Sequence, residues 1–352
     1  MAERYCRALI NEIEKYAPHP SAPHLVDSIY IGGGTPTLMS PGAVRAILDT
    51  CRRRFDLVPD VEISMEANPG TLSGEMLRVF HDSGINRVSL GAQSFCDAEL
   101  ESIGRIHDGA EIITACKQLR DAGVENLNLD LMLGLPGQTA NRWISSLKSA
   151  VDLSPSHLSI YMLELDGKVP LFQSVAAGRC RLPDEESVAD WYLQAIDFLG
   201  SCGLRQYEIS NFAAPGCACR HNLKYWQRVP VLGFGAAAHS YDGRSRYANH
   251  TGLPEYLSAV EAGRPAVVWR EALEPVRELE ETIFLGLRLN KGLDWEQVRR
   301  KFKAGNVAAC EASLQELAGT GLLQWQGSIL RLTPQGMLLS NEVFQRFVHL
   351  EK

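Results

Sequence analysis

The sequence predicts a partial (β/α)6 TIM-like barrel that lacks its first strand, followed by a small C-terminal winged-helix-like α+β domain. Three observations predict this α/β class. Short apolar runs alternate with amphipathic helical patterns, as they do in parallel sheets covered by helices. Most of the runs end in polar or glycine residues. A helical pattern, residues 2–16, stands before the first run, where a barrel would already have a strand.

The strands are expected where Ile, Val, Leu and Tyr cluster, because β-branched and aromatic side chains favour extended backbone. These runs are residues 28–31, 61–65, 87–90, 126–132, 157–161, 206–209 and 231–234. Apolar residues at helical spacing predict helices between them, over residues 41–53, 74–83, 110–122, 143–153 and 185–200. Polar residues follow many separate runs, which favours a barrel mouth over the single switch point of a doubly wound sheet.

The pattern changes near residue 278. Helices are predicted over residues 278–289, 294–302 and 307–320, then a hairpin of 322–326 with 329–332, and a last helix over 334–347. We therefore expect a barrel over 1–245, a connecting segment over 246–277 and a winged-helix-like domain over 278–352. This domain has too little basic charge to read DNA, so a structural lid is the favoured interpretation.

Composition narrows the class of function. The 352 residues carry a net charge of −7, which disfavours nucleic acid and anionic membranes as partners. No run reaches the roughly 18 apolar residues of a membrane helix, and the first residues lack a secretory pattern. The nine cysteines are scattered and odd in number, which is typical of free thiols in a reducing compartment. We expect a cytoplasmic protein that is not an integral membrane protein.

Several run ends carry residues suited to a ligand. The glycines at 32–34 predict a backbone loop that holds an anion, or simply a tight turn. Asp130 could accept two ribose hydroxyls or form a local salt bridge. Glu66 could accept hydrogen bonds from an ammonium group, and Gln93 could bond to a ribose or an amide; each could equally be satisfied within its loop.

Two later segments carry residues of types that bind metals or flat rings. Cys217 and Cys219 are too close for a structural zinc pair and are interpreted as ordinary thiols. The segment HNLKYW at 221–226 joins an imidazole to aromatic rings, which suits a flat ring such as heme but also a packed corner. The small residues of 233–240 would let a ligand approach the backbone closely.

In combination these residues resemble the oxygen-independent coproporphyrinogen III oxidase-like radical-SAM proteins, and among them the HemW-like heme chaperones. The resemblance spans nearly the whole chain in order. It is carried by GGGTP at 32–36, EANPG at 66–70, QSF at 93–95, GRIH at 104–107, LDLM at 129–132, GLPG at 134–137, YE at 207–208, SNF at 210–212, HNLKYW at 221–226 and GxGxxxHS at 233–240.

The resemblance implies a site for S-adenosylmethionine and a site for heme. The residues implied for S-adenosylmethionine are Gly33, Gly34 and Thr35 at the amino-acid end, with Glu66, Gln93, Arg105 and Asp130. The HNxxYW segment separates the heme chaperones from the true oxidase, and the residues implied for heme are His221, Asn222, Tyr225 and Trp226. The partners implied are heme and a heme-accepting respiratory protein.

The chain departs from the family in one respect. Family members carry a CxxxCxxC loop whose three thiolates hold a 4Fe-4S cluster, and this sequence contains no such triplet. We expect an N-terminal truncation, and no reductive cleavage of S-adenosylmethionine by this chain. The alternatives to a heme chaperone are a radical-SAM oxidoreductase acting on a porphyrinogen and an inactive fragment.

Overall fold

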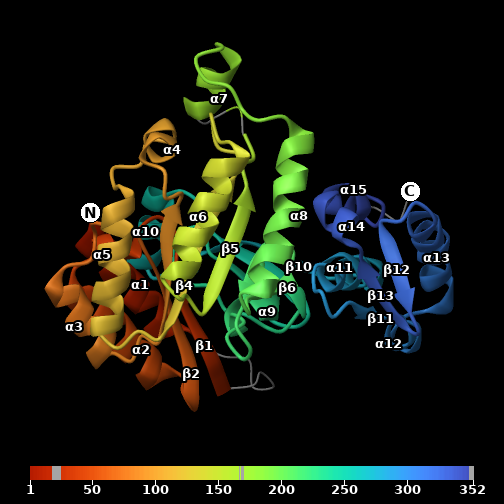
Figure 1. Cartoon of the computed structure of the whole chain (residues 1–352). Coiled ribbons are helices and arrows are strands. Elements are labelled where there is room, and N and C mark those ends of the chain that lie inside the picture. Colours follow the sequence, from red (N-terminus) through yellow and green to blue (C-terminus); the bar gives the residue numbers. More distant parts are fainter. Residues whose placement is uncertain (18–24, 166, 168–169, 349–352) are drawn as a thin grey trace. The chain divides into compact units, whose positions relative to one another are not determined.

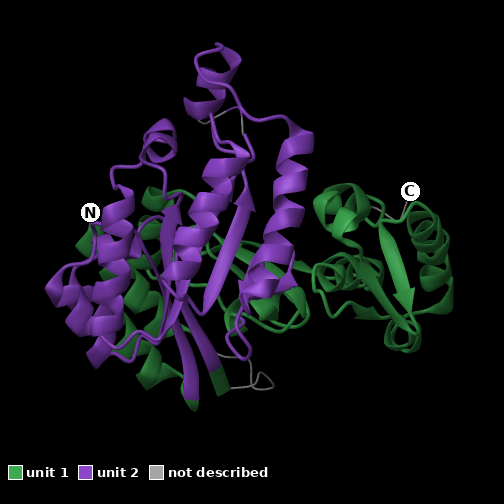
Figure 2. Ribbon diagram, viewed as in Figure 1, with its two compact units in different colours: residues 1–26, 46–59, 219–352 green, residues 27–45, 60–218 purple. Residues whose placement is uncertain are grey.

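A computed structural model describes residues 1–17, 25–165, 167 and 170–348. The chain divides into two compact units (Figure 2). Unit 1 comprises residues 1–26, 46–59 and 219–352, and unit 2 comprises 27–45 and 60–218. The two units are described separately below.

Unit 2 is built on a seven-stranded sheet with the order β1-β2-β3-β4-β5-β7-β6 (Figure 1). The pairs β2–β3, β3–β4 and β4–β5 are parallel, whereas β7 is antiparallel to both of its neighbours. The strands are β1 Leu25–Ile31, β2 Asp56–Ala67, β3 Arg87–Gln93, β4 Asn126–Leu133, β5 His157–Met162, β6 Arg205–Glu208 and β7 Asn211–Ala213.

The helices of this α/β unit bury one stripe each, as the 3.6-residue period dictates. In α5, Gly109–Asp121, the buried residues are Ile112, Ala115, Cys116 and Leu119. In α6, Ala140–Asp152, they are Trp143, Ser146, Leu147 and Ala150. Side-chain caps fix where these helices begin, with Asp108 in a capping box before α5 and Thr139 before α6. The other helices along this stretch are η1 Pro36–Leu38, α2 Pro41–Arg54, α3 Gly74–Asp82, α4 Asp97–Ser102, α7 Pro170–Ala176 and α8 Glu185–Ser201.

Unit 1 contains the first helix, α1 Ala2–Lys15, and α10 Leu253–Glu261, which share a small core formed by Ala8, Tyr256, Leu257 and Val260. A three-stranded antiparallel sheet has the order β10-β9-β8. Its strands are β8 His239–Tyr241, β9 Ser245–Asn249 and β10 Val267–Ala272, and the short helix α9, Arg220–Trp226, comes before them in the chain.

The C-terminal part of unit 1 places helices around a second three-stranded sheet, of order β11-β13-β12. Leu330 and Leu332 of β13 are buried, so one face of the hairpin packs inward. The elements are α11 Pro275–Leu287, β11 Leu293–Asp294, α12 Trp295–Lys301, α13 Ala304–Gly319, β12 Leu323–Gln326, β13 Ile329–Leu332, α14 Pro334–Leu338 and α15 Ser340–Gln345.

The predicted α/β class is confirmed, but two predicted elements were wrong in detail and one small sheet was missed. The run 231–234 is not a strand of the large sheet, because only Val231 forms a bridge, to Tyr241. Gly233 within the run and Gly235 directly after it explain this, since glycine lowers the preference for a strand. The last predicted helix is broken into α14 and α15 at Leu339. The sheet of β8, β9 and β10 was not predicted at all.

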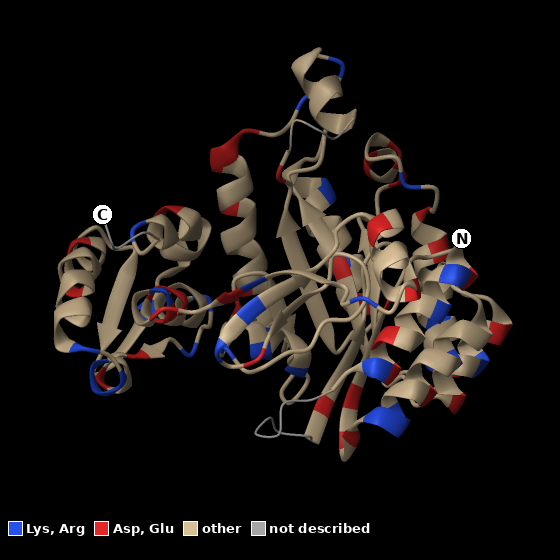
Figure 3. Cartoon of the chain, turned by 180° about the vertical axis from the view of Figure 1, so that it is seen from behind, with Lys and Arg blue, Asp and Glu red and all other residues tan. Residues whose placement is uncertain are grey.

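The surface charges are mixed and most of the cysteines are buried. Acidic and basic residues are interspersed along the helices (Figure 3). The nine cysteines are thiols; Cys6, Cys51, Cys116, Cys219 and Cys310 are buried and Cys202 is exposed. Among the described residues, no helix combines the length and the apolar character that crossing a bilayer requires.

Candidate functional site

The glycine loop follows β1 and faces open space. Gly33 and Gly34 have φ values of 89° and 65°, in the left-handed region that glycine adopts without strain. A Cβ atom added at either position would meet nothing within 4 Å, so the backbone there is open to a ligand. The N–H of Gly33 donates to Oε2 of Glu66 at 3.0 Å, and the hydroxyl of Tyr30 donates to Oε1 at 2.8 Å.

Asn68 connects this loop to Arg105. Its amide Nδ2 donates to the hydroxyl of Thr35 at 3.0 Å, while its Oδ1 accepts from Nη1 of Arg105 at 3.2 Å. Burial lowers the pKa of Arg105, and the charge of Asp130 opposes that effect. The Arg105 guanidinium therefore lies close enough to the Asp130 carboxylate for the two charges to interact.

Gln93 ends β3 in an unusual backbone conformation. Its φ is 67°, its residue is 8% exposed, and the register between β3 and β4 shifts between Leu90 and Gln93. A non-glycine residue held in this region costs about 1–3 kcal/mol, and such strain is concentrated at functional sites. A Cβ atom at Gly91 would lie 2.7 Å from Oδ1 of Asn68 and 3.1 Å from Nε2 of Gln93, which places both amides together.

Asp130 belongs to a group of polar side chains within the sheet, which we call the polar layer. It consists of Ser89, Asn128, Asp130, Ser159 and His157. Ser89 donates to Oδ2 of Asp130 at 2.8 Å, and Nδ2 of Asn128 donates to Oδ1 at 2.7 Å. Because a carboxylate offers about four lone-pair positions, Asp130 keeps acceptor capacity for further donors. Burial raises the pKa of this carboxyl, and hydrogen bonds from Ser89, Ser159 and Asn128 oppose the rise.

His157 closes the polar layer on its inner side. The carbonyl oxygen of Asn128 can only accept, so Nδ1 of His157 carries the proton and donates to it at 2.6 Å. Nε2 then accepts from the hydroxyl of Tyr207 at 2.9 Å. Burial holds the pKa of His157 well below its usual value, with the charge of Arg87 acting in the same direction. The ring is therefore neutral and fixed in one tautomer.

The residues predicted at the strand ends lie in two hydrogen-bonded sets. The first joins Gly33 to Glu66, and the second joins Thr35 to Arg105 through Asn68. The glycine loop links the sets along the chain, and Asp130 acts by its charge on Arg105 and is itself affected by the charge of Glu66. Tyr161 of β5 belongs to the same surroundings, because burial and the charge of Asp130 raise its pKa. The arrangement offers backbone amides, carboxylates and a guanidinium to a single polar ligand.

Glu66 and Asp130 can complement a ligand that carries an ammonium group and a diol. Glu66 accepts from two protein donors, and Asp130 accepts from Ser89 and Asn128 with a further bond from Ser159. A carboxylate offers about four acceptor positions, so capacity remains on both. S-adenosylmethionine carries such an ammonium group and ribose diol, so the residues fit it. The residues do not fit an iron–sulfur cluster in the same way. No group of three His, Cys, Asp or Glu side chains that could hold a metal occurs within the described part of the chain.

The segment proposed for heme forms α9 in unit 1. Nε2 of His221 lies 3.1 Å from the hydroxyl of Tyr225, one helical turn later, and the two rings meet edge to face at 5.3 Å. Tyr225 is 42% exposed. Trp226 turns elsewhere: the guanidinium of Arg288 lies 4.2 Å from its ring centroid, and its indole Nε1 is buried without a hydrogen-bond partner among the described residues. Asn222 is half-buried on the same helix.

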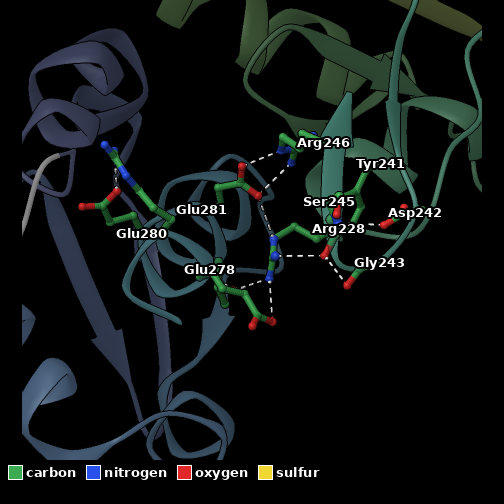
Figure 4. Close-up of polar contacts among 11 residues, drawn as sticks. Arg228, Tyr241, Asp242, Gly243, Ser245, Arg246, Glu278, Glu280 and Glu281 are labelled. Carbon is green, nitrogen blue, oxygen red and sulfur yellow. Dashed lines mark hydrogen bonds and ion pairs between the residues drawn. The ribbon is translucent and has the colours of Figure 1, made fainter. Parts of the chain in front are cut away.

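An arginine–glutamate cluster follows α9 directly (Figure 4). We define it as Arg228, Tyr241, Arg246, Glu278 and Glu281. Arg228 has a φ of 54° and a side chain only 7% exposed, and it binds Glu281 at 3.1 Å and Glu278 at 3.3 Å. Arg246 forms a second bond to Glu281 at 2.8 Å, and its guanidinium lies 4.8 Å from the Tyr241 ring centroid. The cluster fastens the end of α9 to α11.

Sequence reasoning missed the residues that hold the site residues in place. Tyr30, Ser89, Asn128 and His157 were not singled out. A signal existed for Ser89 and Asn128, because these two polar residues interrupt neighbouring apolar runs and the register of β3 and β4 sets them opposite each other. The arginine–glutamate cluster gave no such signal, because its partners lie about fifty residues apart in the chain.

Known proteins resemble this chain along nearly its whole length. A profile of the Radical SAM superfamily matches residues 8–150, and one of the HemN C-terminal domain matches residues 273–339. A heme chaperone HemW from Bacillus subtilis is 37% identical over 350 residues, covering 98% of this chain and 91% of its own length. HemW from Lactococcus lactis is 34% identical over 346 residues, covering 98% and 89%.

A solved structure agrees with these relatives. The coproporphyrinogen III oxidase HemN from Escherichia coli, described as a radical SAM enzyme, superimposes with a TM-score of 0.83 at 26% identity, covering 98% of this chain and 83% of that one. Both the sequence relatives and the fold therefore point in the same direction. The chain belongs to the HemW heme-chaperone family of radical SAM proteins.

Proposed function

We propose that this protein is a heme chaperone that binds S-adenosylmethionine at the strand ends of unit 2 and heme at α9 of unit 1. The observation that carries the first site is the group of Gly33, Glu66 and Asp130, in which both carboxylates keep acceptor capacity and the glycine loop faces open space. The support for heme is the family together with the histidine and exposed tyrosine of α9.

The proposed roles follow from the chemistry of each group. The turn at Gly33 and Gly34, through the amide of Gly34 and the Thr35 hydroxyl, suits the carboxylate of the ligand's amino-acid end, while the amide of Gly33 holds Glu66. Glu66 suits its ammonium group, and Asp130 its two ribose hydroxyls, because a carboxylate can accept several hydrogen bonds. Gln93 and Arg105 would complete the polar surround, with their positions fixed by the backbone bulge and by Asn68.

At α9, His221 and Tyr225 offer what a heme needs, an imidazole and an accessible ring. Asn222 and Trp226 belong to the same proposed segment, with Trp226 acting from its position against Arg288. Such a chaperone would pass heme to an acceptor, which we propose to be a respiratory protein. The cysteine thiols fit a reducing compartment, so we propose a cytoplasmic location. The boundaries 1–245, 246–277 and 278–352 stay a prediction.

A second candidate is radical chemistry on a porphyrinogen, favoured by the likeness to HemN. A 4Fe-4S cluster supplies the electron in such chemistry, and the family holds it with three cysteine thiolates. The described residues do not provide those ligands, so the cluster does not fit the chain as printed. Detection of 5′-deoxyadenosine after anaerobic reconstitution would favour this candidate over the chaperone.

Binding of S-adenosylmethionine is tested by titration calorimetry of the full chain. Asp130→Asn removes the charge from hydrogen bonds worth about 1.5–3 kcal/mol, so we expect affinity to fall about 10- to 100-fold. The matched control is Asp197→Asn, which changes an exposed carboxylate of α8. Equal affinity of Asp130→Asn and the unchanged protein would contradict the assignment.

Binding of heme is tested separately by following the Soret band during heme titration. We expect a shift that His221→Ala weakens and that the control His81→Ala, at a histidine with a side chain 74% exposed, leaves intact. If the unchanged protein gives no shift, the heme proposal fails while the S-adenosylmethionine proposal is unaffected.

A further inference from the structure

Unit 1 contains a cavity of about 370 Å³ whose described lining includes no residue of α9 and which has no part in the function proposed above. It is enclosed by the end of α1, the loop at 232–234, the strands β8, β9 and β10, and the residues that follow α10. Its volume is at the lower end of the range for small-molecule sites, roughly 300–1,000 Å³. The cavity is therefore large enough for a body of one or two rings, or for a short acyl chain.

The interior of the cavity is apolar and aromatic. Tyr16 and Phe234 line it and meet edge to face at 5.5 Å, and Tyr247 of β9 adds a third ring. Val260 and Ala266 supply aliphatic surface, and both are almost fully buried. Flat rings and hydrocarbon chains are the groups that such a lining takes out of water most favourably.

The charged groups of the lining are mostly positive. Lys15, Arg264 and Arg270 are exposed, and no described residue forms an ion pair with Lys15 or Arg264. Arg270 lies 4.5 Å from the centroid of the Tyr247 ring and 3.2 Å from Asp242, so part of its charge is already compensated. Three cations against one lining carboxylate leave the cavity with a positive excess.

That carboxylate, Glu12, is already committed to the walls. Its oxygens accept from Nδ2 of Asn249 at 2.7 Å, from the amide of Gly235 at 2.8 Å and from the hydroxyl of Tyr256 at 2.7 Å. It ties α1 to the loop and to α10 and leaves the exposed cations to a ligand. An anionic group would therefore be held at the cationic rim, away from Glu12.

We propose that this cavity binds a small amphipathic carboxylate, with its apolar body against Tyr16 and Phe234 and its carboxylate between Lys15 and Arg264. The combination carries the assignment: an apolar interior alone would accept neutral molecules, and exposed cations alone would hold any anion weakly. The apolar body has two sources, a fused aromatic ring or a short acyl chain, and both share the carboxylate.

The test is calorimetric titration of the full chain with 2-naphthoate, with octanoate, and with the neutral 2-naphthalenemethanol. We expect a carboxylate to bind and the alcohol to bind at least about tenfold more weakly, since a charge-assisted hydrogen bond contributes on the order of a tenfold change or more. Tighter binding of naphthoate assigns a ring, and tighter binding of octanoate assigns an acyl chain; both support the proposal.

Variants locate the binding. The double variant Lys15→Gln/Arg264→Gln should weaken naphthoate about tenfold or more, whereas Arg244→Gln, an exposed arginine between β8 and β9, should not. Leu232→Trp should block the interior and abolish binding, and thermal melts of each variant verify folding. Absence of carboxylate binding, equal affinity for the alcohol, or an unchanged affinity in the double variant would each overturn the proposal.

Discussion

The polar layer beneath Asp130 and the arginine–glutamate cluster around Arg228 both bury hydrogen-bonding groups, but they leave different capacity unused. In the layer, neutral donors hold one carboxylate that can still accept from a ligand. In the cluster, Glu278 and Glu281 are bound by Arg228 and Arg246, and the guanidinium of Arg228 is divided among several acceptors. Buried polar groups with remaining capacity indicate a binding site, whereas saturated ones indicate a structural joint.

The largest effect is expected at the cluster. Glu281→Ala would leave Arg228, with a side chain only 7% exposed, without its nearest carboxylate. Removing one partner of a buried pair costs up to about 3–5 kcal/mol, and because Glu278 stays bound to Arg228 we expect a loss toward the lower end, which urea unfolding would measure. Affinity for S-adenosylmethionine should not change. Glu261→Ala, which breaks an exposed pair with Arg4, is the control and should have little effect; equal losses in the two variants would show that the cluster is not a joint.

The next effect is expected in the layer. Asn128→Ala leaves the Nδ1 donor of His157 without its acceptor and removes a donor from Asp130. Each buried unsatisfied group costs about 1–3 kcal/mol, so stability should fall by that order. Unlike Glu281→Ala, this variant should also weaken S-adenosylmethionine in calorimetry. A loss of stability with unchanged affinity would mean that the layer supports the fold but not the ligand.

The layer should also make stability depend on pH. Because the pKa of His157 is far below its ordinary value in the folded state, protons bind the unfolded chain first. Stability is then complete above about pH 6.5 and falls as the pH drops below it, by at most about 1.4 kcal/mol per pH unit. Asp130, whose pKa is raised, acts in the opposite direction in acid.

Urea unfolding at pH 7.5, 6.5 and 5.5 measures this slope, and His157→Gln isolates the histidine. We expect the variant to flatten the slope, while His81→Gln, at an exposed histidine, leaves it unchanged. A slope that survives in His157→Gln must arise from other groups.

The smallest effect concerns the glycine loop. Gly33→Ala and Gly42→Ala both place a methyl group in open space, so only the backbone separates them. At Gly33 the φ of 89° should cost alanine about 1–2 kcal/mol, whereas Gly42 lies in α2, where alanine is neutral or slightly stabilising. Thermal melts of the two variants compare them directly, and equal melting temperatures would argue against a left-handed loop.

The sequence predicted those parts of the fold whose signal is local. The stripe of Ile112, Cys116 and Leu119 defined α5, although Ile113, grouped with it, is 52% exposed. The segment SRYAN that forms β9 is short and mostly polar, so its sequence does not predict a strand. It becomes one because it pairs with β8 and β10. Tertiary context decides such segments.

The candidate site divides in the same way. Glycines, Glu66 and Asp130 stand at the ends of predicted runs and could be identified from the chain alone. Asn128 and His157 become meaningful only when register sets Asn128 opposite His157 on β5. Arg228 depends on residues of α11 that no local pattern connects to it. Residues that only the tertiary fold brings into contact could not be paired from the sequence.

The burial of most thiols has a practical consequence for handling the protein. Burial raises the pKa of Cys51, Cys116 and Cys310 to about 11, and thiols react with maleimides as thiolates. Cys202, at the end of α8, is the cysteine classed as exposed. In the native state a maleimide fluorophore should therefore react first at Cys202, ahead of the partly buried Cys96, Cys180 and Cys217. The uptake of further label during heating would then count molecules as they open.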